Sequence, residues 1–242
     1  MGAVDAVPAH VERIVALILA RGGSRRLPGK NVAPLGGRSL VAWTVEAARS
    51  APSVARVIVS TDDDAIADAA LAAGAEVPFR RPPALSDDAA TSEDAALHAL
   101  DWLAGEEGEP EWLMLLQPTS PFRTSEDIEG AVAVSRSQPD MDAVVAVSEL
   151  VPATWLMRLT EGDRLERWDP AAGPEMLYRP NGSIYLVRTA VLRRERTFRP
   201  AATCGYLMPA RRSLDIDTPF DLELAHALLD RASEGERTAS HG

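Results

Sequence analysis

Lys30 is the only lysine among the 25 lysine and arginine residues of the chain. It lies in residues 20–31, ARGGSRRLPGKN, which directly follow an apolar run. A lysine ammonium is a compact charge with rotatable donors, which suits it to a phosphate oxygen. Arg21, Arg25 and Arg26 add positive charge within the same ten residues. The segment therefore predicts a locally basic pocket for an anionic ligand.

The glycine-rich turn at residues 22–24 can bring backbone N–H groups close to phosphates. A P-loop is excluded by spacing, because five residues separate Gly23 from Gly29 and Asn31 follows the lysine. A dinucleotide fingerprint is also excluded, because no G-x-G-x-x-G occurs and Pro28 would interrupt the expected helix. The alternative interpretation of this segment is a mobile surface loop.

Two carboxylates, Asp215 and Asp217, are separated by one residue on an extended segment. Side chains alternate along a strand, so both carboxylates point to the same side. Magnesium prefers oxygen ligands and keeps waters and phosphate oxygens in its shell, so two carboxylates from the protein are sufficient. The alternative for Asp217 is a helix N-cap before Pro219.

The elements that would position these residues alternate along the chain. Continuous apolar runs, which suit strands buried on both faces, occur at residues 13–19, 56–60, 112–116 and 143–147. Helical patterns, several opening with Ser or Asp at the N-cap, occur at residues 39–50, 63–73, 92–103 and 125–135. The alternation predicts an α/β fold with a mostly parallel, Rossmann-like sheet, helices on both faces, and ligands at the carboxyl ends of the strands.

The pattern changes at about residue 148 to scattered Trp, Pro and Arg, with one clear strand at residues 183–187. We interpret this part as an inserted segment, after which a strand at residues 205–208 and a helix at residues 220–229 return the chain to the main domain. The expected organisation is a flexible N-terminus at 1–12, a main domain at 13–147 and 205–232, an inserted segment at 148–204, and a flexible tail at 233–242.

Composition excludes several classes of protein. A formal charge of −11 argues against bulk binding of nucleic acid, which needs an extended basic surface. The acidic runs at residues 62–64, 87–88 and 106–107 are interpreted as solvated turns and helix starts. No apolar run is long enough to span a membrane, and we expect a cytoplasmic protein. The lone Cys204 cannot form an intrachain disulfide and is interpreted as a structural thiol.

Residues 20–31 resemble the signature of the sugar-activating cytidylyltransferases, above all the CMP-acylneuraminate synthetases. Further resemblance to this family lies in LLQPTSPFR at residues 115–123, RPNGSIY at residues 179–185 and SLDIDT at residues 213–218. The four motifs occur in the family's order and cover most of the chain. The related Kdo-transferring enzymes resemble this chain mainly at residues 27–30.

The resemblance implies a nucleotidyltransferase that joins CTP to an acidic 2-keto sugar, an acylneuraminate or related nonulosonate, giving a CMP-sugar and pyrophosphate. It also implies magnesium, or manganese, as cofactor and a homodimer in which the inserted segment packs across a two-fold axis. Two alternatives stay open. One is a cytidylyltransferase for Kdo or another acidic sugar, and the other is a protein that binds CTP or a CMP-sugar without turnover.

The resemblance also implies roles for individual residues. The catalytic residues would be Arg21, Lys30 and Asp217, and the metal ligands Asp215 and Asp217. The nucleotide-binding residues would be Arg21, Gly22, Gly23, Ser24, Lys30, Asn31, Arg81 and Ser92, of which the last two would read cytosine. The acceptor sugar would be bound by Gln117, Asn181, Tyr185 and Phe198. No histidine is well placed as a general base.

Several of these residues also have plainer interpretations. Arg81 could be a solvent-facing charge, Ser92 could cap a helix, and Tyr185 and Phe198 could belong to the core. The chain also departs from the family in two places. DPAAG at residues 169–173 stands where family members that use sialic acid tend to carry Arg-Gln, and Arg199 stands where they tend to carry a second aromatic residue. Arg199 could replace the missing arginine, or the acceptor could be a different sugar.

Overall fold

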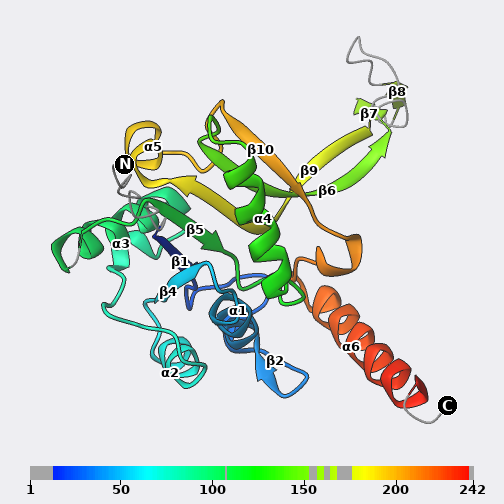
Figure 1. Cartoon of the computed structure of the whole chain (residues 1–242). Coiled ribbons are helices and arrows are strands. Elements are labelled where there is room, and N and C mark those ends of the chain that lie inside the picture. The colour runs from blue at the N-terminus through cyan, green and yellow to red at the C-terminus, as the bar shows by residue number, and fades with distance from the viewer. Residues whose placement is uncertain (1–12, 107, 153–156, 161–163, 168–175, 240–242) are drawn as a thin grey trace, which may run out of the picture.

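The computed structural model describes residues 13–106, 108–152, 157–160, 164–167 and 176–239. Their centre is a six-stranded sheet with the order β10-β6-β9-β5-β1-β4 (Figure 1). The strands are β1 (Ile14–Leu19), β4 (Val54–Ser60), β5 (Trp112–Leu116), β6 (Ala143–Pro152), β9 (Met176–Arg188) and β10 (Thr203–Leu207). Strand β1 pairs in parallel with β4 and β5, and β10 pairs in parallel with β6. The predicted mostly parallel α/β sheet is confirmed.

Strand β9 is the antiparallel member of this sheet. It lies between β5 and β6, with Leu186 opposite both Met114 and Val144. The boundary expected at residue 204 therefore needs correction, because the second half of β9 is part of the central sheet and not of a separate insertion. The sequence around residues 183–187 is apolar because both faces of β9 are covered there. A short apolar run of this kind is equally compatible with a strand of a small insertion, so the sequence alone could not assign it to the central sheet.

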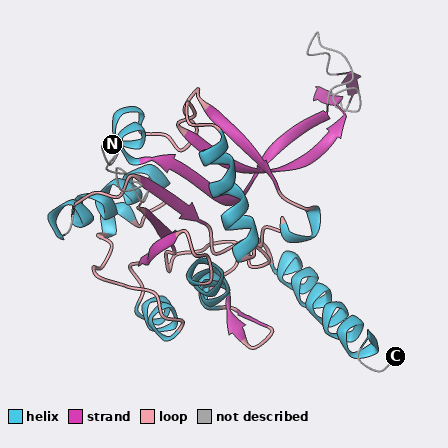
Figure 2. Cartoon of the chain, in the orientation of Figure 1, coloured by secondary structure: helices cyan, strands magenta, loops and turns pink. Residues whose placement is uncertain are grey.

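Helices cover both faces of the sheet (Figure 2). Even-numbered residues of β1 pack in one core cluster with α1 (Leu40–Arg49), α2 (Asp64–Ala72) and α4 (Ser125–Ser137). Odd-numbered residues of β1 pack in a second cluster with α3 (Ser92–Glu106) and α5 (Thr189–Glu195). This alternation is what a strand buried on both faces requires, and it explains the continuous apolar run IVALIL.

Local signals place the starts of several helices. The side chains of Ser39 and Asp63 accept from the backbone N–H groups of the first turns of α1 and α2. Thr124 and Asp127 form a capping box at the start of α4. Helix α5 was not predicted, and α6 (Pro219–Ala239) is longer than expected, so residues 233–239 continue a helix where a flexible tail was expected.

Smaller elements complete the described chain. The short pair β2 (Pro34–Leu35) and β3 (Arg38–Ser39) lies beside α6. The outer parts of β6 and β9 extend away from the body as a two-stranded arm toward β7 (Met157–Thr160) and β8 (Arg164–Arg167) (Figure 1). The expected flexible segment 1–12 and the stretch 169–173 lie outside the described residues. Within the described residues, no helix has the length and apolar character needed to cross a membrane.

Candidate active site

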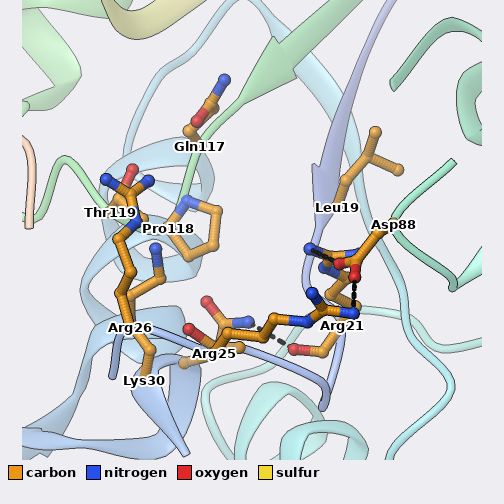
Figure 3. A pocket seen from close by; sticks show the side chains of 11 residues that line it. Leu19, Arg21, Arg25, Arg26, Lys30, Asp88, Gln117, Pro118 and Thr119 are labelled. Carbon is orange, nitrogen blue, oxygen red and sulfur yellow. Dashed lines mark hydrogen bonds and ion pairs between the residues drawn. The ribbon is translucent and has the colours of Figure 1, made fainter. Parts of the chain in front are cut away.

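A cavity of about 390 Å³ lies at the carboxyl ends of β1 and β5 (Figure 3). This is where an α/β sheet places its ligand site. The lining comes from the end of β1, the glycine-rich loop, one residue of the loop before α3, and the start of the loop after β5. The lining residues are Leu19, Arg21, Ser24, Arg25, Arg26, Lys30, Asn31, Asp88, Gln117, Pro118 and Thr119. The structure thus brings together Arg21, Ser24, Lys30, Asn31 and Gln117, all of which the sequence selected.

The glycine-rich loop is held in one conformation by specific contacts. The N–H of Gly22 donates to Asp62 at 3.1 Å, and a Cβ at Gly22 would lie 2.8 Å from an Asp63 carboxylate oxygen, so only glycine fits. The buried Asn31 donates from Nδ2 to the carbonyl oxygen of Arg21 at 2.9 Å. Gly29 has φ +66, in the left-handed region that favours glycine. The two ends of the loop are therefore anchored to the fold, at Gly22 and at Asn31.

The four cations of this cavity are paired with two carboxylates. Asp217 accepts from the Lys30 ammonium at 2.9 Å and from Arg26 at 2.8 Å. Asp88 lies 2.9 Å from Arg21 and also contacts Arg25. Lys30 is the best enclosed of the four, with 15% of its side chain exposed. The two carboxylates offset only part of the charge of the four cations, so this cluster of donors keeps an excess of positive charge for an anionic ligand.

A second cavity of about 270 Å³ adjoins the first, and Leu19, Arg21 and Asp88 line both. Arg81 lines it and is 6% exposed, so the interpretation of Arg81 as a solvent-facing charge is wrong. Burial lowers the pKa of Arg81, while the Asp62 carboxylate raises it and the Arg21 charge lowers it. Its Nε and Nη2 atoms have no hydrogen-bond partner among the described residues. Arg81 Nη2 lies 3.8 Å from Asp62 Oδ1. A guanidinium with spare donors in the lining of a cavity suits a polar planar ligand with acceptor atoms.

Ser92 also lines the second cavity. It is the first residue of α3, but the capping side chain belongs to the residue before it, because Thr91 Oγ1 accepts from Asp94 N at 3.1 Å. The interpretation of Ser92 as the helix cap is therefore wrong, and its hydroxyl stays available to the cavity.

The two carboxylates proposed for the metal, Asp215 and Asp217, flank the buried Ile216 in a segment that is neither helix nor strand. A Cβ on Gly182 would be 3.9 Å from Gln117 Oε1 and 4.0 Å from Asp215 Oδ2, so all three residues meet at one point. Burial raises the pKa of Asp215 and a hydrogen bond with Thr119 lowers it. The neighbouring Asp217 carboxylate raises this pKa and the Lys30 charge lowers it, and the net pKa is above the ordinary value. Asp217 is not the cap of α6, because the Thr218 hydroxyl accepts from Asp221 N at 3.3 Å. Both carboxylates are free of a capping role.

Among the described residues, no group of three or more His, Cys, Asp or Glu side chains is arranged to hold a metal ion. The oxygens of Asp215 and Asp217 nevertheless fit a hard divalent cation that takes its other ligands from phosphate and water. Burial, and to a smaller extent the charge of Asp217, raise the pKa of Asp215, and a bound divalent cation would favour its ionised form.

The remaining candidates for sugar binding, Asn181, Tyr185 and Phe198, are not among the residues that line the two cavities. The side chain of Asn181 is 4% exposed and donates to Ser148 and Ser213 at 3.2 and 3.1 Å, while its Oδ1 accepts from Ser183 N. Asn181 thus joins three segments of the fold. Phe198 is in the core, and its ring lies 6.1 Å from that of Tyr185, which is half-buried.

Sequence reasoning missed two residues that the structure places at or under the cavity. The run Asp87-Asp88 was interpreted as a solvated turn, but Asp88 pairs with the basic loop. Arg123 is 2% exposed and donates to the carbonyl oxygens of Gln117 and Ser183, at 3.3 and 2.9 Å. The signal for Asp88 was its charge opposite to that of residues 21–30. Arg123 gave no signal beyond its position in the motif LQPTSPFR.

The chain is similar to known proteins over most of its length. Residues 15–166 match the family model described as cytidylyltransferase. The CMP-N,N'-diacetyllegionaminic acid synthase of Legionella pneumophila is 34% identical over 234 residues, covering 92% of this chain and 98% of that protein. The N-acylneuraminate cytidylyltransferase of Escherichia coli is 33% identical over 88% of this chain, and the match spans 51% of that longer protein.

A solved structure of a CMP:2-keto-3-deoxy-manno-octonic acid synthetase complexed with CTP is similar in fold, with a TM-score of 0.66 and 20% sequence identity. The similarity covers 91% of this chain and 99% of that one. At this level of identity the likeness shows the fold, a nucleotidyltransferase-type α/β sheet.

Proposed function

The chain belongs to the cytidylyltransferase family, and from this we propose that it transfers a cytidylyl group from CTP to an acidic 2-keto sugar of the nonulosonate class. The observation that carries the proposal is the cavity at the ends of β1 and β5, where one lysine and three arginines meet beside a pair of aspartates. The similarity to the Legionella pneumophila synthase over nearly its whole length supports the choice of sugar class.

The reaction needs positioning and charge neutralisation. The anomeric hydroxyl oxygen of the sugar forms a bond to the α-phosphorus of CTP, the bond from that phosphorus to the bridging oxygen breaks, pyrophosphate leaves, and the hydroxyl loses its proton. Lys30, Arg21 and the N–H groups of the glycine-rich loop are the donors that would stabilise the charge on the phosphates. Cytosine would occupy the second cavity, where Arg81 supplies donors and Ser92 a hydroxyl.

Asp215 and Asp217 would hold magnesium, or manganese. A divalent cation supplies Lewis-acid stabilisation of the leaving pyrophosphate. Asp217 is already shared between Lys30 and Arg26, so it connects the cation site to the phosphate donors. The sugar would lie beside Gln117 and Tyr185, near the point where Gly182 leaves room because it has no side chain.

We also propose a homodimer in the cytoplasm. Three large apolar side chains, Leu150, Tyr178 and Leu207, are 41%, 52% and 49% exposed on neighbouring strands β6, β9 and β10. Contact with a second copy would remove these side chains from water. A monomeric mass at micromolar concentration, measured by light scattering, would contradict this part of the proposal.

The test is release of pyrophosphate from CTP and magnesium with a panel of acceptors. N,N'-diacetyllegionaminate is the first acceptor, followed by N-acetylneuraminate, other nonulosonates, Kdo and a control without sugar. Release with one nonulosonate would support the proposal and identify the acceptor. Release with Kdo alone would change the sugar class, and CTP binding with no release from any acceptor would favour a binding protein without turnover.

A further inference from the structure

The wall between the two cavities contains a carboxylate in contact with two arginines. Asp88 Oδ1 lies 2.9 Å from Arg21 Nη2, and Asp88 Oδ2 contacts Arg25. Figure 3 shows this group on one side of the cavity, whereas Lys30 and Arg26 lie on the other. Asp88 thus offsets part of the charge of the two arginines on this side of the cavity.

The backbone around Asp88 is arranged to present it to Arg21. The preceding Asp87 accepts from the N–H groups of Ala89 and Ala90 at 2.9 and 2.8 Å, which closes a tight turn. The carbonyl oxygen of Asp87 accepts from Arg21 Nη1 at 2.8 Å. Arg21 is therefore bound by two consecutive residues of one turn, through a carbonyl oxygen and a carboxylate.

Asp88 also lies on the route of a nucleotide. Leu19, Arg21 and Asp88 line both cavities, so a ligand with its base in one and its phosphates in the other passes this wall. If the function proposed above holds, as this inference requires, the phosphates need the guanidinium groups that Asp88 contacts. A carboxylate and a phosphate cannot share these donors without repulsion.

We propose that Asp88 is an internal competitor of the phosphate groups for Arg21 and Arg25, and that it weakens the binding of CTP and of pyrophosphate by a common factor. A phosphate ligand must displace the carboxylate when it enters. When pyrophosphate leaves, Asp88 re-forms its pairs with the two arginines, which favours release of this product.

The exposure of the partners suits an exchangeable contact. The side chains of Arg21 and Asp88 are 37% and 43% exposed, and Arg25 is 84% exposed. Pairs of this kind contribute little to stability and are screened by water. Arginine binds phosphate through charge-assisted hydrogen bonds of the stronger kind, so a polyphosphate can replace the carboxylate.

The experiment compares the dissociation constants of CTP and of pyrophosphate, measured by calorimetry without sugar, for the parent protein, Asp88→Asn and Glu46→Gln. Glu46 is the matched control because its side chain is 42% exposed, pairs with Arg38, and lies away from both cavities. Both substitutions remove one negative charge. We expect Asp88→Asn to bind both ligands about fivefold more tightly, and Glu46→Gln to leave both constants unchanged.

Unchanged or weaker binding of both ligands by Asp88→Asn would overturn the inference, as would tighter binding of one ligand alone. Asp88→Ser provides a second variant, and thermal melting checks that each variant folds. Failure of the proposed function is recognised separately. A parent protein that binds pyrophosphate but not CTP would contradict the function, while the pyrophosphate constants would still decide the role of Asp88. Binding of neither ligand would overturn both.

Discussion

Asp88 and Asp127 each pair with arginine, but in different surroundings. Asp88 lies at the mouth of the cavity, with 43% of its side chain exposed, and its partners are loop arginines. The side chain of Asp127 has no exposed surface, and it accepts from Arg212 at 2.7 and 2.8 Å, from Tyr206 at 3.2 Å and from Thr124. One contact can be exchanged for a ligand, and the other joins α4 to the segment before Asp215.

This comparison separates charged residues that are available for ligand binding from charged residues that stabilise the fold. Around the cavity, each pair can be replaced by phosphate or metal at small cost to stability. Beneath it, Arg123 and Asp127 form a buried polar layer that fixes the loop after β5 and the start of α4. Burial lowers the pKa of Arg123 to about 9, although the Asp127 charge raises it. Substitutions in this layer should therefore affect stability, and those at the mouth should affect ligand binding and turnover.

The largest expected effect is that of Asp127→Ala. The substitution removes the carboxylate of the α4 capping box and the acceptor of the Tyr206 hydroxyl and of Arg212, whose side chain is 33% exposed and can be solvated. Loss of the cap together with the charged hydrogen bonds is expected to lower the free energy of unfolding by about 3–4 kcal/mol. Urea denaturation followed by circular dichroism measures it. A loss below 1 kcal/mol would mean that the buried layer behaves like the mouth of the cavity.

Lys30→Ala should show the opposite pattern. Loss of a preorganised donor is expected to raise the activation barrier by ~2.7–4 kcal/mol, with kcat falling accordingly. The stability of the variant should stay close to that of the parent, since its Asp217 partner is 32% exposed and can be solvated. Pyrophosphate release and urea denaturation are measured on the same preparation. A kcat within threefold of the parent value would remove Lys30 from the mechanism.

Acid should reduce the stability of the parent protein through Asp127, by less than the Asp127→Ala substitution does. Burial raises the pKa of Asp127. The hydrogen bonds and ion pair with Arg212, together with the hydrogen bonds from Thr124, lower it more, so the net pKa lies below the ordinary value. Because the pKa of Asp127 is lower in the folded than in the unfolded chain, ionised Asp127 stabilises the fold at pH values above the aspartate pKa of the unfolded chain, about 4. This stabilisation is lost as the pH falls through the pKa of Asp127 in the folded protein. Urea midpoints from pH 6 to pH 3 should therefore fall more steeply for the parent than for Asp127→Asn. Parallel curves would contradict this.

The smallest effect is expected for an ion pair outside both regions. The Arg56 side chain donates to Glu76, which lowers the pKa of Glu76, but the Glu76 side chain is 46% exposed. Glu76→Gln should reduce the free energy of unfolding by only about 0–1 kcal/mol, because water and salt screen such pairs. A loss as large as that of Asp127→Ala would show that exposure does not separate the two kinds of charge.

Local sequence patterns located most strands of the central sheet and several residues that line the two cavities. Continuous apolar runs located β1, β4 and β5, and alternating helical patterns with Ser or Asp caps located α1 and α2. The glycine-rich loop, Lys30 and Gln117 were identifiable because their residue types are unusual beside a buried strand. These signals are local, because apolar periodicity and cap residues lie within a few residues of the strand or helix that they specify.

Only the tertiary structure decided which distant residues face one another. It placed β9 antiparallel between β5 and β6, made Phe198 part of the core, and engaged Asn181 inside the protein. It also brought Asp88 against Arg21, 67 positions earlier in the chain. The physical reason is that strand order and side-chain pairing depend on burial and charge summed over the whole fold, and a linear sequence shows each residue type without showing its partner.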